Sequence, residues 1–229
     1  MVPALAVADE LRASGAEVSF VGTRDRVEAE LVPAAGYELD RIDVTALDRH
    51  NPLRAGIAVL RAGRALAASL RLLRRLRPDA VLVAGGYVAG PVGLAAALSR
   101  TPLVLAESDS RLGLANRLLA PFARRVCLAF PTAGRNGLRY LVTGRPVQRS
   151  VIEVERDAAR ERLGIEPEQF CLLVFGGSLG ARSINVCALE AFGAQAPPSL
   201  ATTVVLHVAG KRDYPELSDR LASLGSPDR

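Results

Sequence analysis

Short apolar runs alternate along this chain with longer segments in which apolar residues recur every three or four positions. The short runs are typical of buried strands in a parallel sheet, and the longer segments are typical of amphipathic helices. The runs predict strands at residues 17–22, 37–44, 80–84, 102–106, 125–129, 170–175 and 203–208. The periodic segments predict helices at residues 3–12, 52–76, 91–99, 112–124, 157–163, 180–192 and 214–224. This alternation of strands and helices predicts a doubly wound α/β architecture.

A breaker cluster, Thr143-Gly144-Arg145-Pro146, interrupts the pattern and predicts a domain boundary near residues 144–155. We divide the chain into a first domain, residues 1–148, and a second domain, residues 149–229. The chain opens directly on a helix, so we expect the first domain to lack its first strand, which lies mid-sheet in such folds. The second domain holds roughly two strand–helix units, and we expect it to be incomplete, because an independent domain usually needs about 100 residues.

The composition is ordinary for a soluble globular protein, with 49% hydrophobic and 23% charged residues in a chain of 229. A membrane span is not expected, because no apolar run reaches about 18 residues. A secretory signal is not expected either, because no basic region precedes an apolar one at the N-terminus. The three cysteines, Cys127, Cys171 and Cys187, lack metal-ligand spacing. We interpret them as reduced packing residues, which favours a cytoplasmic location.

The charge of the chain distinguishes between classes of partner. The net charge is +5, the excess is almost entirely arginine, and aromatic residues make up only 4%. Proteins that bind single-stranded nucleic acid interleave aromatic with basic residues, so no nucleic-acid partner is expected. A phosphorylated ligand or an anionic membrane surface suits this composition better.

The predicted helix at residues 52–76 concentrates the positive charge. At about 100° per residue, one stripe of this helix carries Arg61, Arg64, Arg71 and Arg75. The opposite face carries Val59, Leu66, Leu70 and Leu73. The arginine stripe is either a solvated surface or a contact with anionic lipid headgroups, which would place the protein peripherally on the inner face of the cell membrane.

Glycine-rich turns follow two of the predicted strands. The first is Gly85-Gly86-Tyr87, after the strand at 80–84, and the second is Gly176-Gly177-Ser178-Leu179-Gly180, after the strand at 170–175. Ligands bind at the carboxyl edge of parallel sheets, so we expect two half-sites with substrates between them. The alternative for each segment is a plain strand-to-helix turn.

The second glycine-rich turn suits a phosphate group, because N–H groups at the start of a helix cradle phosphate oxygens. Gly177, Ser178 and Gly180 are therefore candidate nucleotide contacts, and Arg182 could pair with an anion or with nearby carboxylates. The spacing is not GxGxxG and no Lys-Ser/Thr follows, so neither a nicotinamide cofactor nor a P-loop is expected.

Polar residues also follow the predicted strand at residues 102–106. Glu107 and Asp109 could orient hydroxyl groups or accept a proton, and Asn116 lies near enough in the next helix to reach the same place. The alternative is that Asp109 or Ser110 caps that helix.

The two histidines, His50 and His207, are isolated from other candidate ligands or nucleophiles. His207 lies in a strand pattern, and we interpret it as structural. The sequence therefore predicts no metal site.

Seven stretches together resemble the MurG family along essentially the whole chain. They are residues 3–8, 20–23, 85–91, 113–117, 142–147, 176–182 and 210–214. Members of this family transfer N-acetylglucosamine from UDP-GlcNAc to undecaprenyl-pyrophosphoryl-MurNAc-pentapeptide (lipid I), and so serve peptidoglycan synthesis, cell shape and cell division. The resemblance implies an inverting hexosyltransferase of GT-B fold, with two Rossmann-like domains, no cofactor beyond the substrate UDP-GlcNAc, and a membrane-facing first domain.

The resemblance also implies roles for individual residues. Acceptor contacts are implied at Tyr87, Glu107, Asp109 and Asn116, and nucleotide-sugar contacts at Gly177, Ser178, Gly180 and Arg149. In the implied reaction a base deprotonates the acceptor hydroxyl while UDP leaves. The family's candidate base is a histidine that precedes the segment matching Pro3. We expect that histidine to be missing and the chain to be poorly active, which leaves Glu107 as a possible catalytic residue.

The chain departs from the family at two of these places. The family's His-Glu-Gln-Asn reads Ala106-Glu107-Ser108-Asp109, and the family's arginine aligns with Gln148, one position before Arg149. Two other functions remain open on the sequence: a related GT-B enzyme that glycosylates another lipid, and a non-catalytic membrane-binding module.

Overall fold

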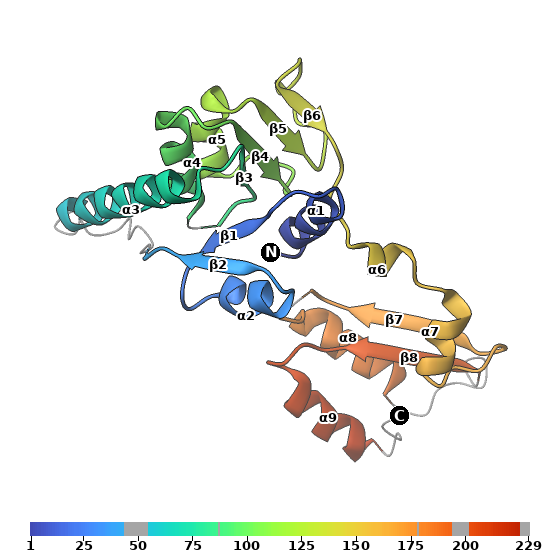
Figure 1. The fold of residues 1–229 in the computed structure, drawn as a ribbon. Helices are drawn as coiled ribbons and strands as arrows, with labels where there is room; N and C mark the ends of the chain where they lie inside the picture. The colour runs from blue at the N-terminus through green and yellow to red at the C-terminus, as the bar shows by residue number, and fades with distance from the viewer. Residues whose placement is uncertain (44–54, 87, 178, 194–201, 225–229) are drawn as a thin grey trace. The chain divides into compact units, whose positions relative to one another are not determined.

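The structure divides the chain into two compact units of parallel strands and helices. This computed structural model describes residues 1–43, 55–86, 88–177, 179–193 and 202–224. The two units comprise residues 1–152 and 153–229 (Figure 1). The boundary predicted after residue 148 falls directly before a short helix, α6 (Arg149–Ile152), which the structure groups with the first unit.

The first unit contains two parallel sheets. One consists of β1 (Ser19–Gly22) and β2 (Glu38–Arg41). The other has its strands in sequence order: β3 (Val81–Val83), β4 (Leu103–Glu107), β5 (Arg125–Leu128) and β6 (Tyr140–Val142). Every neighbouring pair is parallel, so the loops that follow β3 and β4 leave the same edge of the sheet.

The helices of the first unit cover these sheets. They are α1 (Val2–Ala13), α2 (Val27–Ala34), α3 (Ala55–Leu76), α4 (Ala89–Leu98) and α5 (Leu114–Leu119), which continues into a 3₁₀ turn (Ala120–Phe122). α3 packs against α4, and α4 packs against α5. A methyl group on Gly93 of α4 would lie 2.4 Å from Leu119 Cδ1, so the Leu119 side chain of α5 packs directly on this glycine.

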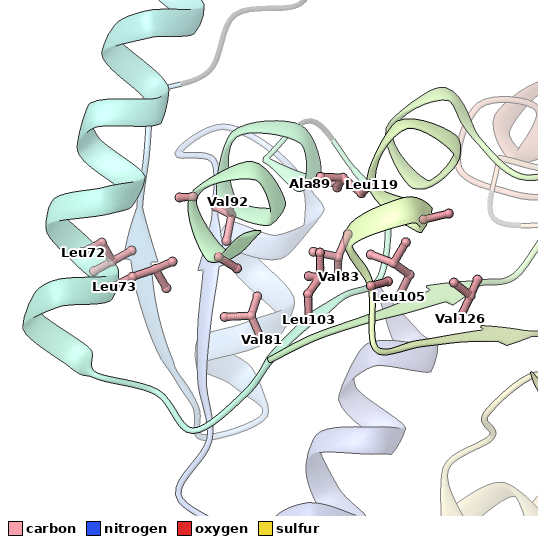
Figure 2. Packing of buried hydrophobic residues seen from close by; sticks show 14 of the residues in the cluster. Leu72, Leu73, Val81, Val83, Ala89, Val92, Leu103, Leu105, Leu119 and Val126 are labelled. Atoms are coloured by element: carbon pink, nitrogen blue, oxygen red, sulfur yellow. The ribbon is translucent and has the colours of Figure 1, made fainter. Parts of the chain in front are cut away.

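The main hydrophobic core lies between this helix layer and the four-stranded sheet (Figure 2). Leu103 and Leu105 of β4 are 1% and 0% exposed. They pack in one cluster with Leu73 of α3, Val92 of α4 and Leu119 of α5. Complete burial of large aliphatic side chains is the main source of stability in a unit of this size, and it holds the carboxyl edge of the sheet in place.

A smaller core joins α1 and α2 to the two-stranded sheet. Leu5, Val32 and Tyr37 are buried there, and the Tyr37 ring meets Phe20 edge to face. The Tyr37 hydroxyl donates to Asp9 at 2.7 Å, so its polar end is satisfied at the rim of the cluster.

The second unit is a smaller parallel α/β arrangement. Its elements are α7 (Arg156–Arg162), β7 (Phe170–Phe175), α8 (Arg182–Phe192), β8 (Thr203–Val208) and α9 (Tyr214–Ser223). β7 and β8 pair in parallel, and Leu189, Ala209 and Leu217 form the buried cluster.

The α/β class with parallel sheets is confirmed, while several predicted details are wrong. The helix predicted at 112–124 is shorter, because Pro121 cannot continue an α-helix and the chain turns into the 3₁₀ segment. The helix predicted at 180–192 begins at Arg182, because Gly180 has φ +77°. The helix predicted at 91–99 begins earlier, at Ala89.

The sequence interpretation missed other features. It did not predict α2, whose short span holds Pro33, or the strand β6. Cys187 is exposed rather than a packing residue, and all three cysteines are free thiols. In the part of the chain that the structure describes, none of the helices combines the length and apolarity needed to cross a lipid bilayer.

Candidate functional site

The first candidate site is the loop that follows β3. Gly85 and Gly86 have φ of +85° and +86°, a conformation that residues other than glycine rarely adopt. A Cβ atom at either position would meet no atom within 4 Å, so the backbone there is open to a neighbouring molecule. Tyr87, the predicted aromatic contact, lies outside the described residues.

The second candidate site is the loop that follows β4, at the same edge of the sheet. Glu107, the last residue of β4, is only 9% exposed. Its carboxylate accepts hydrogen bonds from the backbone N–H of Asp109 at 3.1 Å, the backbone N–H of Gly113 at 2.8 Å, and Asn116 Nδ2 at 3.0 Å. These three hydrogen bonds offset the cost of burying the carboxyl group and fix its orientation.

Asn116 connects α5 to the end of β4. It is 4% exposed, and its Nδ2 donates both to Glu107 and to the backbone oxygen of Ala106 at 3.1 Å. Its Oδ1 is buried and has no hydrogen-bond partner among the described residues. The sequence did not predict this pairing, although it placed Glu107 and Asn116 at one site.

Asp109 differs from these two residues because its side chain is exposed. The loop that carries it is anchored from another direction, since Arg145 Nη2 donates to the backbone oxygen of Ser108 at 3.1 Å. The structure therefore brings Glu107, Asp109 and Asn116 together, with the first and last buried and Asp109 facing outward.

In the second unit, the glycine-rich loop after β7 packs backbone against backbone on the loop after β8. Gly177 and Gly180 have φ of +86° and +77°. A Cβ atom on Gly180 would lie 2.0 Å from the carbonyl oxygen of Ala209, and one on Gly210 would lie 2.6 Å from the nitrogen of Gly180. Gly180 and Gly210 are therefore required for the close approach of the two loops, whereas Gly177 is required only for the turn. Ser178 lies outside the described residues.

A buried polar network lies beneath this loop, and sequence reasoning missed its centre. Asn185 of α8 is 0% exposed, and its Nδ2 donates to Ala209 O at 2.9 Å and to Asp213 at 3.1 Å. Its Oδ1 lies 3.0 Å from His207 Nε2. The sequence signal that could have identified Asn185 is that this polar residue lies on the same face of α8 as the buried residues Ala188 and Leu189.

The two titratable groups of this network, Asp213 and His207, both have lowered pKa values. The pKa of Asp213 is lowered, chiefly by its hydrogen bonds from Arg212 and also by that from Asn185. The pKa of His207 is lowered because burial disfavours its charged form. A neutral His207 with its proton on Nε2 can donate to Asn185, so the histidine has a structural partner.

Two arginines proposed for anion binding are engaged with carboxylates. Arg182 makes a bidentate ion pair with Glu216, with both distances 2.8 Å, and this hydrogen bonding raises its pKa. Arg149 forms an ion pair with Glu10 inside the first unit, and that hydrogen bond lowers the pKa of Glu10.

The arginine stripe of α3 is on the outside of the first unit. Arg61, Arg64 and Arg71 are exposed, and within the described ranges none of them forms an ion pair with a carboxylate. Arg75 pairs with Asp40. Large apolar side chains of the same helix layer are exposed too: Leu60 is 70%, Leu98 60%, Leu118 63% and Phe122 62% exposed.

The described residues contain no group of three or more His, Cys, Asp or Glu side chains arranged to hold a metal ion. The sites above therefore offer backbone N–H groups, carboxylates and amides rather than metal ligands. Such groups suit the recognition of hydroxyl and phosphate groups.

Comparisons with known proteins agree with this arrangement. The model of the glycosyltransferase family 28 N-terminal domain matches residues 1–128. A protein of Moorella thermoacetica is 42% identical over 93% of this chain, and one of Nitrosococcus oceani is 43% identical over 93%. Both are named UDP-N-acetylglucosamine–N-acetylmuramyl-(pentapeptide) pyrophosphoryl-undecaprenol N-acetylglucosamine transferase. The chain spans 58% of the length of each of these relatives.

Solved structures show the same fold. The crystal structure of Acinetobacter baumannii MurG superimposes with a TM-score of 0.66 at 27% identity, covering 98% of this chain and 59% of that one. The calicheamicin glycosyltransferase CalG4, at 18% identity and a TM-score of 0.58, shows the GT-B type of fold alone. The resemblance to MurG that the sequence stretches indicated is confirmed, and the chain belongs to glycosyltransferase family 28.

Proposed function

We propose that this chain provides the acceptor-binding domain and part of the donor-binding domain of an enzyme that transfers N-acetylglucosamine from UDP-GlcNAc to lipid I. The observation that carries this proposal is the 42–43% identity, over 93% of the chain, to relatives named as that transferase. The site geometry supports it, because both glycine-rich loops and the Glu107 loop offer hydrogen-bonding groups suited to sugars and phosphates.

On the acceptor side, the proposed contacts are at the carboxyl edge of β3 and β4. Tyr87 and Asp109 would meet the sugar hydroxyl groups of lipid I, while the buried Glu107 and Asn116 would hold the loop that carries Asp109. The open backbone at Gly85 and Gly86 supports close approach of a ligand there.

On the donor side, Gly177, Ser178 and Gly180 are proposed to bind the pyrophosphate of UDP-GlcNAc through backbone N–H groups and the serine hydroxyl. A base removes the proton of the acceptor hydroxyl, whose oxygen then forms a bond to the anomeric carbon as the bond to UDP breaks with inversion. Donors near the departing pyrophosphate stabilise its developing charge. Arg149 is proposed as a further donor contact, which requires its guanidinium to leave Glu10.

We also propose that the helix layer of the first unit contacts an anionic membrane surface. Its support is the combination of exposed arginines on α3 with exposed apolar residues on α4, α5 and the 3₁₀ turn. Apolar side chains can enter the interface while arginines meet lipid phosphates.

A binding experiment tests the acceptor and donor. The chain is titrated with a water-soluble lipid I analogue, with a diacylglycerol analogue and with UDP-GlcNAc, and binding is followed by NMR shifts. We expect the lipid I analogue to shift amides at residues 85–86 and 108–113, and UDP-GlcNAc to shift amides at 176–180. Binding of the diacylglycerol analogue alone would favour the glycolipid transferase, and binding of none of the three would refute the proposed substrates.

Vesicle sedimentation tests the membrane contact separately. Each basic residue near an anionic surface contributes about 1 kcal/mol, so the triple variant R61Q/R64Q/R71Q should lose roughly a hundredfold in partitioning to phosphatidylglycerol vesicles. The matched control is R156Q/R162Q/R220Q, which removes the same charge from exposed positions of the second unit. Equal losses in the two variants would mean that binding follows net charge and not this surface.

A further inference from the structure

Glu107 and Asp109 are two residues apart in one loop, yet their carboxylates have opposite environments. Glu107 is 9% exposed and its two oxygens accept from three N–H donors. Asp109 is exposed, and its side chain makes no hydrogen bond or ion pair with the described residues. Of these two carboxylates, only that of Asp109 is therefore open to a ligand.

The donors to Glu107 show what its carboxylate does. Oε1 accepts from the backbone of Asp109, and Oε2 accepts from the backbone of Gly113 and the side chain of Asn116. The carboxylate thus holds both ends of the 109–113 segment, and Asn116 fixes it from α5. Turning this carboxylate toward a ligand would break the three hydrogen bonds that it accepts.

The orientation of Asn116 supports the same view. Both neighbours of its Nδ2, the Ala106 carbonyl and the Glu107 carboxylate, are acceptors, so the amide cannot be turned around. This leaves Oδ1 buried without a donor. Burial of an unpaired acceptor costs free energy. The two hydrogen bonds that Asn116 Nδ2 donates, which hold β4 and its loop together, offset this cost.

We propose that Glu107 is a positioning residue which, together with Asn116, sets the conformation of the 108–113 loop so that the Asp109 carboxylate meets hydroxyl groups of the bound sugar. This role deepens the proposed function and rests on it, because the ligand of Asp109 is the acceptor sugar. Glu107 acts through Asp109 and does not itself contact the acceptor.

Amide hydrogen exchange tests the positioning role in the chain alone. In E107Q the side-chain oxygen can serve Gly113 and Asn116, but the new NH₂ group then faces the N–H of Asp109. We expect the protection of the Asp109 amide from exchange to fall at least about tenfold in E107Q, and to be unchanged in the control E17Q, which alters an exposed glutamate. Unchanged exchange at Asp109 in E107Q would overturn the positioning role.

A double-mutant cycle tests whether Glu107 acts through Asp109. Binding of the water-soluble lipid I analogue should weaken about tenfold in D109A, for loss of the hydrogen bond to the carboxylate, and by a similar factor in E107Q. The double variant E107Q/D109A should bind no more than about twofold weaker than D109A, because the two changes remove one interaction.

Three results would contradict the inference. The first is losses that multiply in the double variant, since Glu107 would then contact the sugar itself. The others are undiminished binding in D109A and undiminished binding in E107Q. If E107Q does not fold, N116A replaces it, because N116A removes one donor and keeps the carboxylate. If the unaltered chain does not bind the analogue, the proposed acceptor is refuted, while the exchange measurement still decides whether Glu107 positions the loop.

Discussion

Replacement of Gly180 by alanine is expected to destabilise the second unit far more than the same replacement of Gly177. Both glycines have positive φ, +77° and +86°, so both changes carry the cost of a left-handed backbone, about 1–2 kcal/mol. The surroundings differ. A Cβ atom at residue 177 meets nothing within 4 Å, whereas one at residue 180 lies 2.0 Å from the carbonyl oxygen of Ala209.

That carbonyl oxygen has little freedom to move. Ala209 is 6% exposed, and its oxygen accepts the hydrogen bond from Asn185 Nδ2 at 2.9 Å. The added methyl group must push this loop away at about 1–3 kcal/mol for overpacking, and it weakens a hydrogen bond that contributes about 1 kcal/mol. We therefore expect a destabilisation of about 3–6 kcal/mol for G180A, against about 1–2 kcal/mol for G177A.

Hydrogen–deuterium exchange of peptides from β7 and β8 across a urea series measures the free energy of unfolding of the second unit. It does so independently of the first unit. For the two variants and the unaltered chain, the slope of the unfolding free energy against urea concentration is compared first. An equal slope shows that the mutation has not changed the unfolded state, so the difference in free energy reports the folded state. If G180A and G177A destabilise equally, the contact with Ala209 contributes nothing and the close packing of the two loops is refuted.

Three further outcomes are expected. Leu105→Ala removes a side chain that is 0% exposed and should destabilise the first unit by about 2–5 kcal/mol in urea unfolding, whereas Leu98→Ala, at a position 60% exposed, should cost under about 1 kcal/mol. Burial lowers the pKa of His207 below 6.5, so the unfolded state binds the proton at a higher pH than the folded state does. The free energy of unfolding of the second unit should therefore be highest above pH 6.5 and decrease below it, and H207Q should remove this dependence. The hydrogen bond from Arg212 lowers the pKa of Asp213 below 3.8, so the ionised carboxylate stabilises the second unit above pH 3.8. This stabilisation is lost as the pH falls through the lowered pKa, and D213N should lack this loss when urea midpoints are measured between pH 5 and 2.

Much of the fold was predictable because most of its strands are short apolar runs with polar or glycine-rich segments on either side. The strands β7 and β8 were predicted with the bounds that the structure has, and β3, β4 and β5 to within a residue or two. The helix α2 was not predicted, since eight residues that include Pro33 give too short a periodic pattern.

The candidate site was only partly predictable. Glu107, Asp109 and Asn116 could be placed at one sheet edge, because they lie at the end of one predicted strand and in the segment after it. The sequence could not predict that Glu107 and Asn116 are buried while Asp109 is exposed. The two carboxylates have the same chemistry and lie two positions apart in the sequence.

By itself, the amino-acid sequence determined the α/β class, the positions of the main strands, and the family to which the chain belongs, because these depend on apolar patterning and on short contiguous stretches. Only the tertiary structure decided which polar groups are buried and paired. Glu107 receives its donors from a loop and from α5, and Asn185 joins α8 to β8 and to the loop before α9. The physical reason is that a hydrogen bond requires its partners within about 3 Å, and for residues far apart in sequence that distance is set by the packing of whole elements.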